Sequence, residues 1–372
     1  MKSLLQSLFK DTVKSTEPSS SAFSLAALQS ANPALAAQFV WRTNELPDPL
    51  PARWLHWGCS SNVFDEFVNV DFAAGPPVLE WDFLDDWPTQ AAGRFEGAFS
   101  EDTLEHFFLG EQAYILCNLN VLLKRGGVSR ILMPSWRRLM ALGPKAAAPG
   151  EFLRETFGVA TEVDAMNVGL RFSGHRWLHD AESLAFLAAD CGFNTVPTSC
   201  AESTVAWLSN RNLRSEDDSA SFATDLVKRA ELRRIEVLPA EVAGAERVEV
   251  LEGGIEVWHA TAADAQVRYA LDVPMSASTV ALANIRSANL SEFRSHYYKS
   301  VAFCHTGAEG VDAVWRFDET LKSKPCMNLV TRQQIRQATV QLPAIDGVRF
   351  RPVSQPGQYF TLGPLELFLE AP

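Results

Sequence analysis

Five short apolar runs between residues 54 and 133 constrain the fold of this chain more than any other feature. Each run has the length of a β-strand, and turns or helical stretches separate one run from the next. Because their apolar character is nearly continuous, the runs suit a sheet that is covered on both faces. The five runs are Trp54–Trp57, Phe67–Phe72, Val78–Phe83, Phe95–Ser100 and Val128–Met133.

Helical patterns fill the spaces between and after these runs. Apolar residues recur at helical spacing over residues 104–122, and the basic residues and glycines of 124–127 predict the end of that helix. A second helix is predicted over residues 180–191, with Asp180 as its N-cap, followed by a strand at Phe193–Thr198. Strands that alternate with helices favour parallel pairing. We therefore predict a doubly wound, mostly parallel α/β sheet.

The chain length of 372 residues favours two or three domains. We predict an N-terminal leader over 1–50, helical at 24–38, and a ligand-binding α/β domain over 51–230. Residues 231–372 are predicted to form an all-β sandwich with one helix over Leu290–Ser300. Its predicted strands are Val248–Leu251, Gly254–Ala260, Val267–Val273, Val311–Phe317 and Ala338–Leu342.

Charge and composition exclude several classes of protein. A net charge of −12 argues against broad binding to nucleic acid. The six cysteines show no zinc-ligand spacing, which predicts reduced, mostly buried thiols and no metal site. No apolar stretch approaches the roughly 18 residues of a membrane span, so we expect a cytoplasmic protein. The stretch 3–9 is expected to form an amphipathic helix that packs on its own chain, with peripheral membrane attachment as the alternative.

The carboxyl ends of the first two predicted strands carry candidate ligand contacts. In an open parallel sheet, ligands bind at that edge, where the strand order reverses. Gly58, Cys59 and Ser60 follow the first strand, and a glycine there lets the backbone approach a ligand closely. Asp71 ends the second strand, where its carboxylate can accept both hydroxyls of a ribose. An ordinary tight turn and a solvated carboxylate remain the alternatives.

The third predicted strand ends at Asp82 and Phe83. Asp82 can accept from an adenine amino group while Phe83 covers the ring. A helix cap at Asp82 and core packing by Phe83 are the alternative.

The fourth predicted strand leads into the densest titratable cluster of the chain, Ser100-Glu101-Asp102-Thr103-Leu104-Glu105-His106. On a helix that begins near Glu101, Asp102 and His106 share a face. The alternative is a negatively charged first helical turn that offsets the helix dipole.

These segments resemble the class I methyltransferases that use S-adenosylmethionine. The resemblance is closest to a bacterial subset with a Ser-Glu-His-x-Leu-Glu-His motif, and it covers roughly residues 53–229. The matching segments are Leu55–Cys59, Asn69–Asp71, Trp81–Phe83, Phe99–His106, Leu122–Gly127, Arg130–Pro134, Gly174–Asp180, Cys191–Phe193 and Glu202–Ser203.

The resemblance implies S-adenosylmethionine as the cofactor. Its amino acid and ribose parts would contact the glycine loop and Asp71, and its adenine would contact Asp82 and Phe83. Ser100 and Glu101 are also expected to line the cofactor site. The candidate bases for a hydroxyl acceptor are Asp102, His106 and His175, with a structural hydrogen bond as the alternative for each histidine.

The sequence departs from the subset at two positions. Ser60 replaces the second glycine of the loop, which is tolerated if its φ is negative but otherwise crowds the methionine part of the cofactor. Asp102 replaces the first histidine of the motif, and an aspartate needs a raised pKa to act as an effective base near neutral pH.

The C-terminal residues 348–368 are similar to the closing strands of β-sandwich modules found beside sugar-transferring enzymes of bacterial surface-polysaccharide synthesis. This favours O-methylation of a sugar or glycan-linked acceptor, with Trp258 or Trp315 as stacking platforms or, alternatively, as core. A second hypothesis is an inactive methyltransferase-like scaffold or glycan-binding protein. A nicotinamide-dependent oxidoreductase fits less well, because the first loop lacks Gly-x-Gly-x-x-Gly.

Overall fold

The computed structural model describes residues 42–371, apart from 73–74, 147–151, 172–173, 214–219, 251–254, 291–296, 311–312, 318–325 and 354. Most of the predicted leader, including its helix over 24–38, therefore lies outside the described residues. Residues 38–372 form one compact unit. No helix in the described ranges is both long and apolar enough to cross a membrane.

A seven-stranded sheet forms the centre of the α/β region, in the order β3-β2-β1-β4-β5-β7-β6. The strands β1 to β5 pair in parallel, and only β7 runs antiparallel to its two neighbours. The order reverses between β1 and β4, which is the place where such sheets bind ligands. The strands are β1 Trp54–Trp57, β2 Phe67–Asp71, β3 Leu79–Glu80, β4 Phe95–Glu101, β5 Leu123–Pro134, β6 Phe193–Thr198 and β7 Ser221–Lys228.

The prediction of a mostly parallel sheet is confirmed, with differences at its edges. All five apolar runs contain strands, although the third contributes only Leu79 and Glu80. The strand β7 was not predicted, because Thr224 and Asp225 interrupt its apolar pattern. Both residues are nevertheless buried. The guanidinium of Arg130 on β5 contacts the Asp225 carboxylate at 3.2 Å and offsets its buried charge.

The helix that follows β4 begins later than the sequence predicts. It is α4, Leu109–Leu122, preceded by the 3-10 turn η2 at Leu104–His106. A helix beginning near Glu101 is wrong, because Glu101 still belongs to β4 and Asp102 has a φ of +51°. The predicted basic last turn and glycine stop are also wrong, since residues 123–127 belong to β5.

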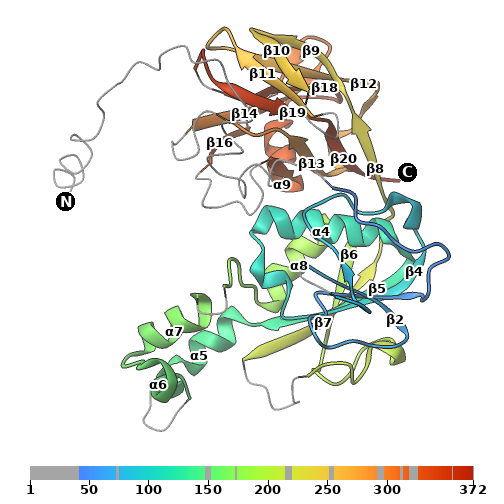
Figure 1. The fold of residues 1–372 in the computed structure, drawn as a ribbon, viewed down its shortest axis with the longest axis vertical. Helices are drawn as coiled ribbons and strands as arrows, with labels where there is room; N and C mark the ends of the chain where they lie inside the picture. The colour runs from blue at the N-terminus through green and yellow to red at the C-terminus, as the bar shows by residue number, and fades with distance from the viewer. Residues whose placement is uncertain are drawn as a thin grey trace. The chain divides into compact units, whose positions relative to one another are not determined.

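Helix α4 is buried on opposite sides by two different sheets. It lies against the seven-stranded sheet and also contacts three strands of a four-stranded sheet, β8 (Leu232–Val237), β13 (Val280–Arg286) and β17 (Met327–Thr331) (Figure 1). The ring centroids of Tyr114 on α4 and Phe368 on the fourth strand, β20 (Leu365–Glu370), lie 5.8 Å apart. One hydrophobic core therefore continues from the α/β region into the β-rich region, which explains why α4 is buried nearly all around.

Three further helices form a group after β5 (Figure 1): α5 Trp136–Ala146, α6 Phe152–Phe157 and α7 Glu162–Arg171. They were not predicted. The helix predicted over 180–191 is confirmed as α8, Ala181–Asp190. Its N-cap is Asp180, as predicted, because Asp180 Oδ1 accepts the Ser183 amide at 2.9 Å. Short 3-10 turns complete the helical elements: η1 Thr89–Ala91, η3 Ala206–Leu208 and η4 Ala277–Thr279.

The C-terminal region consists of three antiparallel sheets, so the β-rich character is confirmed. Their orders are β10-β11-β19, β15-β14-β18-β12-β9 with β16 paired to β14, and β17-β13-β20-β8. The strands are β8 Leu232–Val237, β9 Pro239–Ala243, β10 Ala245–Val250, β11 Glu256–Ala260, β12 Gln266–Met275, β13 Val280–Arg286, β14 Tyr297–His305, β15 Ala308–Glu309, β16 Ala313–Phe317, β17 Met327–Thr331, β18 Ile345–Arg351, β19 Tyr359–Leu362 and β20 Leu365–Glu370.

Two predictions in this region are wrong. The predicted helix over Leu290–Ser300 ends in strand β14, whose aromatic and β-branched residues suit a strand, while residues 291–296 lie outside the described residues. The predicted strand Ala338–Leu342 instead begins at the last residue of helix α9, Arg332–Ala338. That helix is favoured because Gln334 Oε1 accepts the Thr331 amide at 2.9 Å, which caps its first turn.

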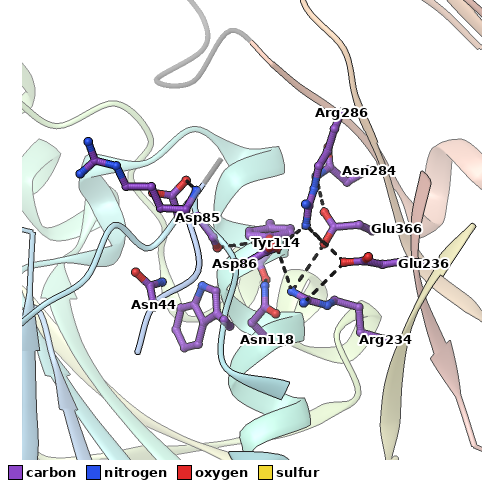
Figure 2. A network of polar contacts seen from close by, with 12 residues as sticks. Asn44, Asp85, Asp86, Tyr114, Asn118, Arg234, Glu236, Asn284, Arg286 and Glu366 are labelled. Atoms are coloured by element: carbon purple, nitrogen blue, oxygen red, sulfur yellow. Dashed lines mark hydrogen bonds and ion pairs between the residues drawn. The ribbon is translucent and has the colours of Figure 1, made fainter. Parts of the chain in front are cut away.

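A network of charged side chains joins the α/β region to the four-stranded sheet (Figure 2). The guanidinium of Arg286 on β13 contacts both Asp86 and Glu366, and Arg234 on β8 contacts the same two carboxylates at 3.5 Å. Burial raises the pKa of the Glu366 carboxyl, and the two guanidiniums act against that shift. Because Asp86 follows β3 and Glu366 lies on β20, the network fixes the two regions to each other through opposite charges.

Candidate functional site

The loop after β1 requires a glycine at its first position. Gly58 has a φ of +70°, and a Cβ on it would lie 2.1 Å from Thr103 Oγ1. Thr103 follows β4, so the loops after β1 and β4 touch at the point where the strand order reverses. The Gly58 and Cys59 amides donate to the Val70 carbonyl at 2.9 and 3.3 Å. The loop is thereby folded back over the end of β2.

Ser60 and Asp71 are brought together, as the prediction of a shared site requires. The Ser60 amide donates to Asp71 Oδ2 at 2.7 Å. The condition of a negative φ at Ser60 is not met, because its φ is +46°. A non-glycine residue in this region costs roughly 1–2 kcal/mol, and the bond to Asp71 offsets part of that cost. Asp71 thus acts first as the residue that holds the loop in shape.

Cys59 occupies the buried side of this loop. Burial, with a smaller effect of the Asp71 charge, raises the pKa of its thiol to about 11. A thiol with that pKa stays protonated at neutral pH and is a poor nucleophile. Cys59 therefore shapes the loop rather than supplying covalent chemistry. All six cysteines are free and five are buried, as predicted.

The end of β3 is tied to the same loop system, since the Trp81 amide donates to the Asp71 carbonyl at 2.8 Å. Asp82 Oδ1 accepts the Leu84 amide at 2.9 Å. The Phe83 ring is buried, and its centroid lies 5.7 Å from that of Trp57. The burial of Phe83 fits the core alternative, whereas Asp82 caps a turn and not a helix. The adenine contacts of Asp82 and Phe83 stay a prediction.

Three more predicted residues lie at the carboxyl end of β4. The Ser100 side chain is wholly buried, and Glu101 Oε2 accepts the Leu213 amide at 2.8 Å. Asp102 is exposed, and its amide donates to the Leu132 carbonyl of β5 at 3.0 Å. Asp102 thus stands between the ends of two neighbouring strands, with its carboxylate at the surface.

The structure brings His106 and His175 together with Glu105, although 69 residues separate the two histidines in the chain. The two imidazole centroids lie 5.2 Å apart. His175 Nε2 lies 3.9 Å from Glu105 Oε1, and the Glu105 side chain is wholly buried. The amides of Arg176 and Trp177 donate to the Glu105 carbonyl at 2.8 and 3.2 Å, which explains why the two segments meet.

No family model and no curated protein matches this chain. Among solved structures, the CurJ carbon methyltransferase is 14% identical, with a TM-score of 0.29, and the match covers 50% of this chain and 50% of that one. The CMeT domain of the citrinin polyketide synthase is 11% identical, with a TM-score of 0.31, over 49% of this chain and 48% of that one. The chain thus covers about half the length of each of these two proteins.

A carbohydrate-binding module is also among the similar solved structures. The xylan-binding module CBM86 from Roseburia intestinalis is 14% identical, with a TM-score of 0.25, and the match covers 37% of this chain and 95% of that one. At such low identities and TM-scores, these similarities assign neither a family nor an activity to the chain.

Two polar residues that hold the site together were not predicted. Gln112 on α4 donates from Nε2 to the carbonyls of Leu104 and Trp177 at 2.8 and 3.1 Å. Its Oε1 lies 2.6 Å from His179 Nε2. Burial lowers the pKa of His179 to about 4, so this imidazole is neutral and donates from Nε2. A polar residue among apolar helix positions is the only signal for Gln112 in the sequence.

Two of the cavities in the described part of the chain bear on function, and both lie outside the glycine loop. One, of about 270 Å³, lies at the carboxyl end of β5 and is lined in part by Arg137, Arg138, Asp180 and Glu182. The other, of about 250 Å³, lies on the six-stranded sheet, with charged residues that include Arg268 and Arg349.

Neither predicted stacking tryptophan is shown in that role. Trp258 is half-buried and donates from Nε1 to Glu256 Oε2 at 3.0 Å. The side chain of Trp315 lies outside the described residues.

Proposed function

We propose that the protein is an S-adenosylmethionine-dependent methyltransferase that O-methylates a sugar or glycan-linked hydroxyl group. The observation that carries this proposal is the contact between Ser60 and Asp71. It joins the loop after β1 to the end of β2, beside the position where the strand order reverses. A crevice at that position is the usual ligand site of an open α/β sheet.

The residues at this edge of the sheet suit the cofactor. Gly58 lets the Thr103 side chain pack directly against the loop, so the loops after β1 and β4 meet at the edge where open sheets bind ligands. Asp71 uses Oδ2 for the Ser60 amide, and a carboxylate has further acceptor positions for the ribose hydroxyls. When bound, S-adenosylmethionine supplies a methyl group on a sulfonium centre. Methyl transfer is an in-line displacement, so the main task of the protein is to position the acceptor.

The cavity at the end of β5 supports a hydroxyl-rich acceptor. The guanidiniums of Arg137 and Arg138 and the carboxylates of Asp180 and Glu182 line it, and such groups form hydrogen bonds with sugar hydroxyls. The acceptor hydroxyl must lose its proton during the reaction. Asp102 is the exposed candidate base, and His106 and His175 are the other two.

One observation favours the second candidate function, a methyltransferase-like scaffold that binds glycans without catalysis. Ser60 replaces a glycine of the resemblance and adopts a positive φ. Under the condition stated for this position, its side chain would then crowd the methionine part of the cofactor. The charged cavity on the six-stranded sheet would then be the functional site.

The two candidates are separated by an assay of the full chain with methyl-labelled S-adenosylmethionine and a panel of oligosaccharides. We expect transfer of the label to at least one sugar hydroxyl, and its loss in Asp71→Ala. Oligosaccharide binding without any label transfer or cofactor binding would instead establish the scaffold.

A further inference from the structure

Glu105, His106 and His175 form a cluster with the composition of a transition-metal site. Each side chain offers one ligand atom, and the three atoms lie within 4.8 Å of one another. Two imidazoles and one carboxylate are a ligand set that suits divalent first-row metals. His106 and His175 were predicted as candidate bases, but the sequence predicted no metal site, because the members come from η2 and from a segment that precedes α8.

The imidazole of His175 is oriented as in metal-binding histidines. Its Nδ1 lies 2.9 Å from the Gly169 carbonyl oxygen. A carbonyl oxygen only accepts, so Nδ1 carries the proton, and in the neutral ring Nε2 presents a lone pair. That atom faces Glu105 Oε1 at 3.9 Å. Ligating histidines commonly donate their other ring N–H to a backbone carbonyl in this way.

The cluster is held in place by the backbone and by Gln112. The Arg176 and Trp177 amides donate to the Glu105 carbonyl, and Gln112 Nε2 bridges the carbonyls of Leu104 and Trp177. Zn²⁺ binds imidazole nitrogen and carboxylate oxygen at about 2.0–2.2 Å, so two ligands of one ion lie roughly 3–4 Å apart. The His175 Nε2 to Glu105 Oε1 distance of 3.9 Å falls within that range, and the His106 ligand atom lies within 4.8 Å of both.

Two of the three residues are shielded from water. The Glu105 side chain is wholly buried and that of His175 is 9% exposed. The second group at metal-ligand spacing in the described ranges consists of the carboxylates of Asp86, Glu236 and Glu366. These contact the guanidiniums of Arg234 and Arg286 (Figure 2).

We propose that Glu105, His106 and His175 bind one divalent transition-metal ion. Next to the acceptor, such an ion would lower the pKa of the acceptor hydroxyl, which leaves Asp102 to take up the proton. This role depends on the proposed methyl transfer, whereas metal binding itself does not.

The test is a metal titration of the full chain after dialysis against a chelator, without S-adenosylmethionine. Zn²⁺ binding is measured by calorimetry, and Co²⁺ binding is measured by its visible absorption. We expect one equivalent of each ion and a higher melting temperature with Zn²⁺. Glu105→Gln and His175→Ala should each weaken binding at least tenfold. His106→Ala, at a half-buried position, serves as the variant least disturbing to folding.

His259→Ala is the matched control, because His259 Nδ1 lies 3.3 Å from Glu246 Oε1 in the β-rich region. This variant should bind metal as the unmodified protein does. Three results overturn the proposal: no stoichiometric binding, binding that His106→Ala leaves unchanged, or a Co²⁺ thiolate band that places the ion on a cysteine. If S-adenosylmethionine binds and the metals do not, the proposal fails while the proposed function stands. If the metals bind and S-adenosylmethionine does not, the metal site stands while the proposed function fails.

Discussion

The Ser60 amide donates a 2.7 Å hydrogen bond to Asp71 Oδ2, and Ser60 holds a positive φ to do so. This contact makes the loop after β1 and the end of β2 one unit. The side chain of Asp71 therefore has two tasks, because it supports the loop and is also the proposed ribose acceptor.

Replacement of Ser60 by glycine should preserve this contact and relieve backbone strain. We expect Ser60→Gly to raise the free energy of unfolding by up to about 1 kcal/mol, measured by urea denaturation. Ser61→Gly is the control, because Ser61 is also exposed but has no positive φ. That change should lower the free energy of unfolding by roughly 0.5–1 kcal/mol. Equal effects of the two variants would show that Ser60 is not strained in solution.

Gly58 and Gly93 separate the effect of backbone conformation from that of space. Both have a positive φ, but a Cβ at Gly93 meets nothing within 4 Å, whereas at Gly58 it collides with Thr103. Gly93→Ala should cost about 1–2 kcal/mol of unfolding free energy. Gly58→Ala should cost about 1–3 kcal/mol more, and it should also abolish cofactor binding. Similar costs for the two variants would mean that the loops after β1 and β4 do not touch.

Arg130 and Asp225 form a wholly buried ion pair, so the free energy of unfolding should depend strongly on the presence of both charges. Arg130 Nη1 lies 3.2 Å from Asp225 Oδ1. Arg130→Met leaves the Asp225 carboxylate buried without that cation, so we expect a loss of about 3–5 kcal/mol in urea denaturation. Adding Asp225→Asn should restore part of this loss. If the double variant shows the sum of the two single effects, the pair is not coupled.

Two buried histidines predict that the protein loses stability in mild acid. Burial lowers the pKa of both His56 and His179 to about 4. The unfolded chain takes up these protons near the ordinary histidine pKa of about 6.5, whereas the folded protein does so only near pH 4. Each histidine's contribution to the free energy of unfolding is therefore fully present above about pH 6.5. As the pH falls toward 4, the free energy of unfolding decreases by roughly 3 kcal/mol for each of them.

This pH effect is tested by urea denaturation of the protein and of His179→Gln between pH 7.5 and 4.5. The variant should lose roughly 3 kcal/mol less than the unmodified protein over this range. Identical pH profiles would show that His179 is protonated in the folded protein.

The sequence predicted the strands that carry the site because their apolar character follows directly from burial on both faces. It also placed Gly58 and Asp71 correctly at strand ends, since turn glycines and terminal carboxylates are local signals. It did not predict β7, whose buried Asp225 depends on Arg130, a partner nearly one hundred residues away.

The cluster around Glu105 was missed for a similar reason. Its geometry depends on Gln112 and on backbone hydrogen bonds between segments that are distant in the chain. The expected helix at Glu101 failed because a positive φ at Asp102 interrupts the helical backbone. A regular spacing of apolar residues can be recognised in a sequence. A single backbone angle or a contact between distant segments creates no such spacing.

The most direct test of the central claim is a calorimetric titration of the full chain with S-adenosylmethionine. We predict micromolar, one-to-one binding that Asp71→Ala abolishes, while Asp65→Ala, at an exposed carboxylate near the same loop, leaves it unchanged. An absence of binding to the unmodified protein, or an equal affinity in Asp71→Ala, would contradict the account.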